Sequence, residues 1–430
     1  MRKHHFSQPV YASLLLLFFP LWNMAQGSAE LTLNECYTLS KQNYPLIKQQ
    51  ELILKSKEYS VQNAGTGYYP QVAIYGQATY QSDVISLPIS IPGQTTPLLA
   101  KDQYKIYAEV NQPLYDGGMV RSQKRIQEAA GVIEEQKLEV ELYKLKDRVN
   151  QLFFGVLLVD QQVEQIVLLK KDLQTSIAKT EASISNGVAL KSNADVLKAE
   201  QLKANQRITE LKAARKVYCE MLGMFINKPL DEKTKLVQPE AVLVSQTLNR
   251  PELLLFDQQY KTIDLQHQQL KAKNMPKFSL FAQGGYGRPA LNPLNNKFDT
   301  YYLGGIRMNW SLTGFYTFKN DKALLDINRR NVEVQKELFV FNTNYALKQQ
   351  NTEVEKYLEL LTSDNEIITL RTAIKSRSSA QLENGVISAS DYLRELNAEE
   401  QAKEAKILHE VQLLLARYNQ QTTYGDTAKN

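Results

Sequence analysis

The chain has 430 residues, a formal net charge of +5 and only 4 histidines. Its basic residues form no cluster, so the composition gives no indication of nucleic-acid binding. His267 and His409 lie far apart without metal-ligand spacing, and the sequence has no nucleotide-binding loop, nucleophile elbow or zinc-protease motif. We therefore expect no enzyme activity, no metal and no other cofactor.

Residues 1–27 have the features of a secretory signal peptide. A basic start precedes an apolar stretch from Val10 to Leu21, which is too short to span a bilayer, and small residues follow it. We expect cleavage after Gly27 or Ala29 and an exported mature protein. No other long apolar run follows, so we expect no transmembrane helix.

The chain has two cysteines, Cys36 and Cys219. An exported protein can pair them in a disulfide. Two separate thiols at buried helix positions are the favoured interpretation. Cys36 lacks the small, apolar residues that precede a lipid-attachment cysteine, so we expect no lipid anchor.

The sequence contains two copies of one unit of about 200 residues, far longer than the repeats of a solenoid. The clearest echo is an Asn-Gly-Val segment followed by an aspartate, at residues 186–195 and again at residues 384–391. We predict a first repeat at 28–240 and a second at 241–430. Their register differs only between the proline that precedes each strand region and the next long helix, and we expect the deletion to lie in a loop.

Four segments alternate apolar and polar residues, as two hairpins at residues 71–114 and 278–312. Each segment is long enough for a tilted strand to cross a bilayer. The opposite, polar face includes Lys105, Glu109 and Arg307. A soluble sandwich shows the same alternation, but the signal peptide and the long helices favour a barrel wall in a membrane.

Four strands are too few to close a barrel, because single-chain bacterial barrels begin at about eight strands. Open strand edges in lipid leave backbone groups unpaired, at a cost of several kcal/mol each. If these strands cross a membrane, several chains must share one barrel. Two chains would supply eight strands and three would supply twelve, by simple multiplication.

The remainder of each repeat is predicted to be helical. The stretch from Gly118 to Ser185 contains no proline and has apolar residues at heptad spacing, which indicates a coiled coil. These positions are Leu138, Leu142, Leu145, Val149, Leu152, Val156, Val159, Val163 and Ile166. The second repeat has a similar proline-free run, Tyr316–Glu383, with looser heptads. At 1.5 Å per residue each run reaches about 100 Å, so we expect a tube or stalk.

Shorter helices are expected to lie end to end beside each long one. They are Leu33–Gly65 and Ser192–Phe225 in the first repeat, and Glu252–Asn274 and Ala389–Tyr418 in the second. The stretch from Leu222 to Asn249 contains the joint, so we predict a belt of irregular structure halfway along the rod.

With these features in this order, the chain resembles the TolC-like outer membrane efflux family. The resemblance rests on the duplication, the paired Asn-Gly-Val turns, Tyr69-Pro70 before the first strand, the strand exit at residues 114–118 and the end of the first repeat at residues 214–223.

The resemblance implies an α+β membrane protein with an internal duplication. Three chains would close a twelve-stranded β-barrel in the outer membrane, continued by a long antiparallel α-helical barrel in the periplasm. The homotrimer would be a passive exit duct, joined by a periplasmic adaptor protein to an inner membrane pump of the RND or ABC type.

The resemblance also assigns candidate residues at the periplasmic tip. The adaptor-docking residues would be Gly187, Val188, Ala189, Leu190, Gly385, Val386, Ile387 and Ser388. Asp391 matches an acidic ring at the family's gate, and we take Asp195 as its equivalent in a first turn that is two residues longer. Arg394 stands where some members have a second acid, and it is placed to pair with Asp391 at i,i+3.

A plainer explanation of the turns is also open. Asn-Gly followed by aspartate is the stop and start that any helical hairpin needs. This explanation is favoured for Asp195, and the gate is favoured for Asp391. For the whole protein, the main alternative is an exported structural coiled-coil stalk or adhesin without channel activity, which would have no barrel strands.

Overall fold

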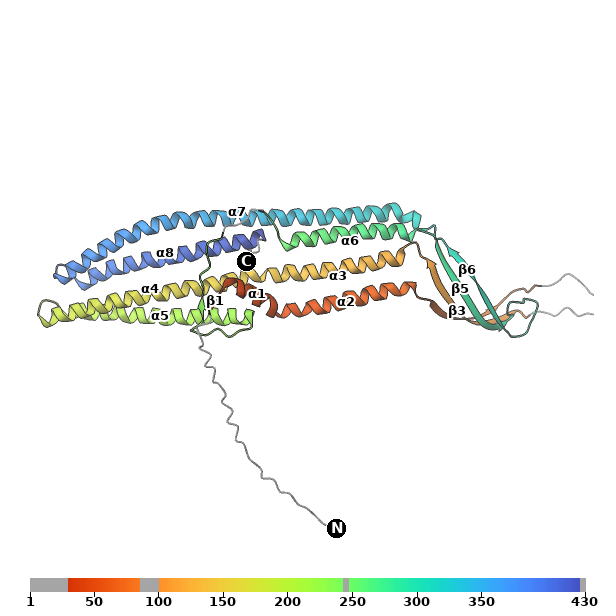
Figure 1. Cartoon of the computed structure of the whole chain (residues 1–430), viewed down its shortest axis with the longest axis horizontal. Coiled ribbons are helices and arrows are strands. Elements are labelled where there is room, and N and C mark those ends of the chain that lie inside the picture. The colour runs from red at the N-terminus through yellow and green to blue at the C-terminus, as the bar shows by residue number, and fades with distance from the viewer. Residues whose placement is uncertain (1–29, 86–99, 243–246, 426–430) are drawn as a thin grey trace, which may run out of the picture.

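The computed structural model describes residues 30–85, 100–242 and 247–425. The predicted signal peptide and its cleavage sites lie outside these residues. The described chain is an elongated rod of helices with a β-sheet at one end (Figure 1). This shape follows from the proline-free heptad runs, which extend far beyond the dimensions of a globular domain.

Both repeats share one order of main elements: a helix, a hairpin of two strands, a long helical stretch and a returning helix. The first comprises β1 (Glu30–Leu31), α1 (Leu33–Asn43), a 3₁₀ turn (Pro45–Lys48), α2 (Gln49–Gly65), β2 (Gln71–Tyr80), β3 (Asp102–Tyr115), α3 (Met119–Tyr143), α4 (Leu145–Ser185), α5 (Lys191–Ile226) and β4 (Lys235–Leu236). The second comprises α6 (Pro251–Lys273), β5 (Lys277–Arg288), β6 (Asp299–Asn309), α7 (Gly314–Glu383) and α8 (Ala389–Tyr424). The deletion in the second repeat falls in the loop between its strands, as predicted.

The long and short helices lie as the lengths predicted. α2 and α5 lie end to end beside α3 and α4, and α6 and α8 lie end to end beside α7 (Figure 1). The joint between the short helices lies midway along the rod. There β1 pairs in parallel with β4, and this pairing joins the segment before α1 to the end of the first repeat.

Two predicted helices are interrupted. The expected helix Leu33–Gly65 breaks at Tyr44, which takes an extended backbone (φ −62°, ψ 132°) because Pro45 disfavours the helical conformation in the residue before it. The expected run from Gly118 to Ser185 is divided at Lys144, whose angles stay helical and whose N–H lies 3.4 Å from the Val140 carbonyl. This second interruption does not turn the helix.

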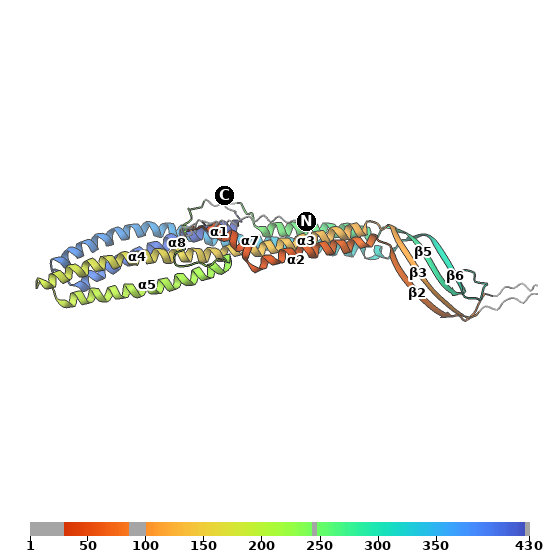
Figure 2. The same ribbon diagram turned by 60° about the horizontal axis from the view of Figure 1, so that its bottom comes forward.

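The four longer strands form one antiparallel sheet in the order β2-β3-β5-β6. Figure 2 shows the sheet continuing the rod from the helix ends, with its strands inclined to the rod axis. β3 carries an irregularity between Pro113 and Tyr115, where proline can be accommodated because it has no N–H to donate. The predicted end of the second hairpin is wrong by three residues, because Trp310, Ser311 and Leu312 lie outside β6.

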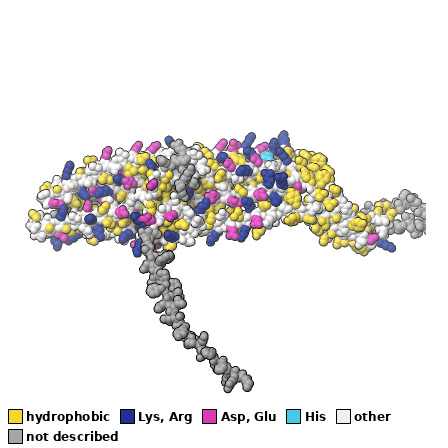
Figure 3. Space-filling model, viewed as in Figure 1, with side chains coloured by type: hydrophobic (Ala, Val, Ile, Leu, Met, Phe, Trp, Pro, Cys, Tyr) yellow, Lys and Arg dark blue, Asp and Glu magenta, His cyan; other side chains and the backbone are white. Residues whose placement is uncertain are grey.

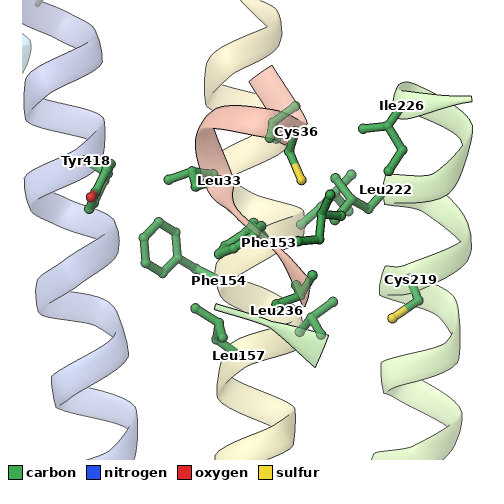
Figure 4. Close-up of a cluster of buried hydrophobic side chains, with 14 of the residues drawn as sticks. Leu33, Cys36, Phe153, Phe154, Leu157, Cys219, Leu222, Ile226, Leu236 and Tyr418 are labelled. Atoms are coloured by element: carbon green, nitrogen blue, oxygen red, sulfur yellow. The ribbon is translucent and has the colours of Figure 1, made fainter. Parts of the chain in front are cut away.

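The largest core cluster lies at the joint. Phe153 and Phe154 project from α4 between α1, α5 and α8, where Leu222 and Tyr418 meet them (Figure 4). The predicted heptad positions of α3 and α4 are buried, apart from Val163, which is partly buried. Cys36 and Cys219 are buried in this cluster with free thiols.

Within the described residues, Met119–Ser185 is long and apolar enough to cross a membrane by length and composition alone. In the structure it is a core helix, since Val149, Phe153 and Phe154 on it are at most 1% exposed. Its apolar residues are therefore explained by packing against the neighbouring helices.

Candidate functional site at the helical tip

Two turns close the helical hairpins at the end of the rod opposite the sheet (Figure 1). In the first, the Val188 N–H donates to the Ser183 carbonyl at 2.9 Å, and in the second, the Val386 N–H donates to the Gln381 carbonyl at 2.8 Å. Gly187 (φ 72°) and Gly385 (φ 69°) take the left-handed conformation. Both turns are Schellman motifs, in which the left-handed glycine lets its own N–H and that of the following valine bond to carbonyls of the last helical turn. The two Asn-Gly segments therefore end their long helices, as the sequence predicts for a helical hairpin.

The two turns enclose a cleft of about 760 Å³. Of the eight predicted docking residues, all but Gly187 line it. Three apolar side chains at its rim are largely exposed: Val188 by 74%, Leu190 by 72% and Val386 by 70%. Exposed apolar residues gathered beside a cleft indicate a surface for another protein.

Asp391 is held in place by local bonds. Its carboxylate accepts from the Ser388 hydroxyl (2.7 Å) and the Ser388 N–H (3.2 Å), while its own N–H donates to the Ser388 oxygen (3.2 Å). These bonds, and Arg394 nearby, lower the pKa of Asp391. The predicted ion pair is present, with the Arg394 nitrogen 3.8 Å from the Asp391 oxygen, but the exposure of both side chains to water makes such a pair weak.

The predicted equivalence of Asp195 and Asp391 is wrong. Five residues separate the helices in each turn, 186–190 and 384–388, so the first turn is not longer. Asp391 is the third residue of α8, whereas the third residue of α5 is Asn193. Asp195 lies two positions further along α5 and is exposed. The prediction was based on the number of residues from the glycine to the next aspartate. That count matched two aspartates that occupy different positions in their helices.

Bonds between the two hairpins were not predicted. The Lys179 ammonium on α4 lies 2.7 Å from the Glu383 carboxylate on α7. Further along, the Lys375 ammonium on α7 lies 3.1 Å from Asp172 on α4 and 2.9 Å from Glu399 on α8. Lys375 therefore connects three helices.

Glu399 is the centre of this network and is only 2% exposed. Thr372 donates to its carboxylate at 2.8 Å, and the Lys403 ammonium lies 3.0 Å away. Burial acts to raise the pKa of Glu399, but the bonds from Lys375, Thr372 and Lys403 outweigh it, so the pKa is lowered.

The next residue, Glu400, is buried, and among the described residues it forms no ion pair. The Gln165 amide donates to one carboxylate oxygen at 2.9 Å, and the other oxygen has no hydrogen-bond partner within the described chain. Burial raises the pKa of Glu400 from its ordinary 4.5 to about 7, against the opposing effect of Gln165. Glu400 thus takes up a proton near neutral pH between α4 and α8.

Glu400→Gln tests this assignment. Because the folded pKa lies above the unfolded one, the folded state binds the proton more tightly, and wild-type stability falls as pH rises from about 4.5 to about 7. A glutamine imitates the protonated acid, so E400Q should exceed wild type by up to about 3 kcal/mol above pH 7 and match it below pH 4.5. Urea unfolding monitored by circular dichroism across this range measures the difference.

The control is Glu220→Gln, at a glutamate on α5 whose side chain is 62% exposed. It should leave the pH profile of stability unchanged. A stability difference between E400Q and wild type that does not vary with pH would contradict the assignment.

The chain is similar to known proteins both in sequence and in fold. Residues 36–220 match the model of the family described as outer membrane efflux protein. The match runs from α1 into α5 and includes the first tip turn. None of the curated proteins compared with the chain is significantly similar to it in sequence.

Several solved outer membrane channels have a similar fold over nearly the whole chain. CusC aligns at 12% identity with a TM-score of 0.67, covering 94% of this chain and 96% of that protein. VceC from Vibrio cholerae aligns at 11% identity with a TM-score of 0.65, covering 92% and 97%. MtrE of Neisseria gonorrhoeae, in its open state, aligns at 13% identity with a TM-score of 0.62, covering 92% and 89%.

Proposed function

We propose that three copies of this chain, which belongs to the outer membrane efflux protein family, form one passive exit duct of a tripartite efflux or type I secretion system. The sheet would lie in the outer membrane and the helices in the periplasm. An adaptor protein and an inner membrane pump, of the RND or ABC type, would deliver cargo to the helical tip.

The exposure of the two faces of the sheet carries this proposal. The apolar face is the open one: Ile74 is 75% exposed, Tyr302 87% and Ile306 71%. On the polar face, Glu109 is 8% exposed and is bound by Arg307 at 2.7 Å. Figure 3 shows hydrophobic side chains gathered over the sheet end of the molecule. Lipid outside and water inside account for this arrangement, whereas a soluble sandwich would cover its apolar face.

The edges of the sheet support assembly from several chains. β2 and β6 are its outermost strands, and each pairs on one side only within the described chain. Lipid does not supply hydrogen bonds to the free side of a strand. Three sheets of four strands, joined edge to edge, would form a barrel of twelve strands, which lies within the range of known barrels.

A second surface for assembly lies on α7. Six exposed apolar residues repeat at heptad spacing there: Leu324, Ile327, Val334, Leu338, Phe341 and Tyr345, each between 52% and 70% exposed. Asn331 occupies the one polar position of this stripe. A heptad stripe with a single asparagine is typical of a helix that packs against a partner helix in one register. The neighbouring copy of the chain is the partner that we propose.

Phe341→Glu should therefore block trimer formation. A carboxylate on each copy would have to be buried in the interface, at about 2 kcal/mol or more each. Phe341→Leu keeps an apolar residue and should still assemble. The mass of the complex in detergent distinguishes these results, and a trimer of the glutamate variant would contradict the proposed packing.

The cleft between the two tip turns is the proposed docking site for the adaptor. Its rim carries Val188, Leu190 and Val386, which a partner's apolar residues could cover. Both turns depend on glycine, because the left-handed conformation costs other residues about 1–3 kcal/mol. Any change of turn shape would displace the rim residues.

Gly385→Val should abolish most export while the trimer still forms. Valine is β-branched and fits poorly at φ 69°, so the second turn must rearrange. Export is measured by complementing a strain that lacks the duct. The control is Gly284→Val, on a strand where a Cβ would meet nothing within 4 Å. Full export by the Gly385 variant would remove this turn from the docking site.

We also propose that Asp391 contributes to a gate at the entrance. Three copies converging on one axis would place like charges together, which keeps the closed state only modestly favoured. A partner that binds the open state more tightly can then shift the equilibrium. The lowered pKa keeps Asp391 ionised at neutral pH.

In planar bilayers the purified trimer should conduct ions, and multivalent cations added at the tip side should block it. Asp391→Ala should weaken the block about tenfold, since it removes the converging charges. Asp195→Ala should leave the block unchanged, because Asp195 lies elsewhere on its helix. Equal block in wild type and Asp391→Ala would exclude Asp391 from the gate, and absence of conductance would contradict the duct itself.

The alternative function, an exported stalk or adhesin, explains the helices alone. It predicts no barrel strands, whereas one end of the rod is a four-stranded sheet with an exposed apolar face. The duct explains both parts of the molecule.

A further inference from the structure

The polar face of the sheet, which carries Glu109 and Arg307, also carries a row of tyrosines across its strands. Tyr75 on β2 is paired with Tyr107 on β3. Tyr107 is paired with Gly285 on β5, and Gly285 with Tyr301 on β6. These four positions form one continuous line through the sheet. They share the face of Glu109 and Arg307, opposite the open apolar face.

Two rings of this row are stacked, and the third lies over the glycine between them and itself. The centroids of Tyr75 and Tyr107 lie 5.1 Å apart, with their planes at 27°. A Cβ at Gly285 would lie 2.5 Å from the Cβ of Tyr107 and 3.0 Å from Cε1 of Tyr301. Only glycine therefore fits at position 285 while the Tyr301 ring lies over its backbone, next to Tyr107. Tyr75, at the end of the row, remains 46% exposed.

The charges next to the row balance. On one side, Lys105 and Asp299 share a row through Gly287. On the other side, Glu109 is paired with Arg307. Neither flank has an excess of one sign, so the row offers aromatic surface without strong selection by charge. Aromatic faces stack on flat rings and attract organic cations.

We propose that this tyrosine row, Tyr75, Tyr107 and Tyr301, is a contact strip for cargo with flat aromatic groups as it passes through the duct. The inference rests on the proposed function, because it places the polar face of the sheet in the lumen. Barrel strands are tilted, so each row follows a slanted path along the wall. Three chains give three such strips.

The test measures current block in planar bilayers by two cations of equal charge and similar size. Benzyltrimethylammonium has an aromatic ring, and (cyclohexylmethyl)trimethylammonium has a saturated one. Wild type should bind the aromatic cation more tightly than the saturated one. Tyr107→Leu should weaken binding of the aromatic cation about threefold to tenfold and leave the saturated cation unaffected. Tyr107→Phe keeps the ring and should retain the preference.

The matched control is Tyr302→Leu, which removes a tyrosine from the opposite, lipid-facing side of β6 and should change neither affinity. Equal block by both cations in wild type, or an unchanged preference in Tyr107→Leu, would overturn the strip while leaving the duct intact. A purified trimer that does not conduct would overturn both proposals. Unaltered ion conductance in Tyr107→Leu shows that the variant has assembled.

Discussion

Hydrogen bonds missing from the edges of a sheet are the constraint on which the rest of this structure depends. One chain supplies four strands, and β2 and β6 each leave one side of their backbone without a strand partner in the described chain. In lipid these groups have no water to bind, at a cost of several kcal/mol each, so edge must meet edge. In the proposed trimer, the sheets of three chains close a ring, and the helices that follow then surround the same axis. The long rods, the exposed stripe on α7 and the tip turns are consistent with that closure.

Local features of the fold were readable from the sequence. The heptad seam of α3 and α4, the alternating strands and the glycines of the tip turns each depend on residues close together in the chain, and all three were predicted. Tyr44 shows where this reasoning was incomplete, because the proline after it should have ended the helix. Asp195 was misplaced because the spacing from a glycine to an aspartate does not define a position in a helix, whereas the cap does.

Features that depend on contacts between residues far apart in the chain could not be predicted from the sequence pattern. Lys375 binds Asp172 and Glu399, and nothing in the chain indicates which of many lysines would bridge three helices. The stripe on α7 is a regular heptad, but heptad spacing alone does not show whether the residues face the same chain or remain exposed. The tyrosine row became apparent only from the strand register, which joins β3 to β5 across the two repeats. Pairing of this kind depends on the fold rather than on spacing.

The two repeats have also diverged in how deeply their long helices are buried. α4 is deeply buried, with Val149, Phe153 and Val156 fully enclosed, whereas α7 buries few residues within one chain. At the tip, an apolar cluster that includes Leu173 and Tyr392 holds α8 to α4. The links from α7 to α4 that the structure shows there are polar, Lys179 to Glu383 and Lys375 to Asp172. Polar links can be exchanged for water or for a partner's groups at modest cost, whereas a buried apolar core has no such substitute. In the proposed gate, the polar links between α7 and α4 are therefore the contacts at the tip that cost least to exchange, whereas Lys375 and Glu399 should stay together because burial makes their separation costly.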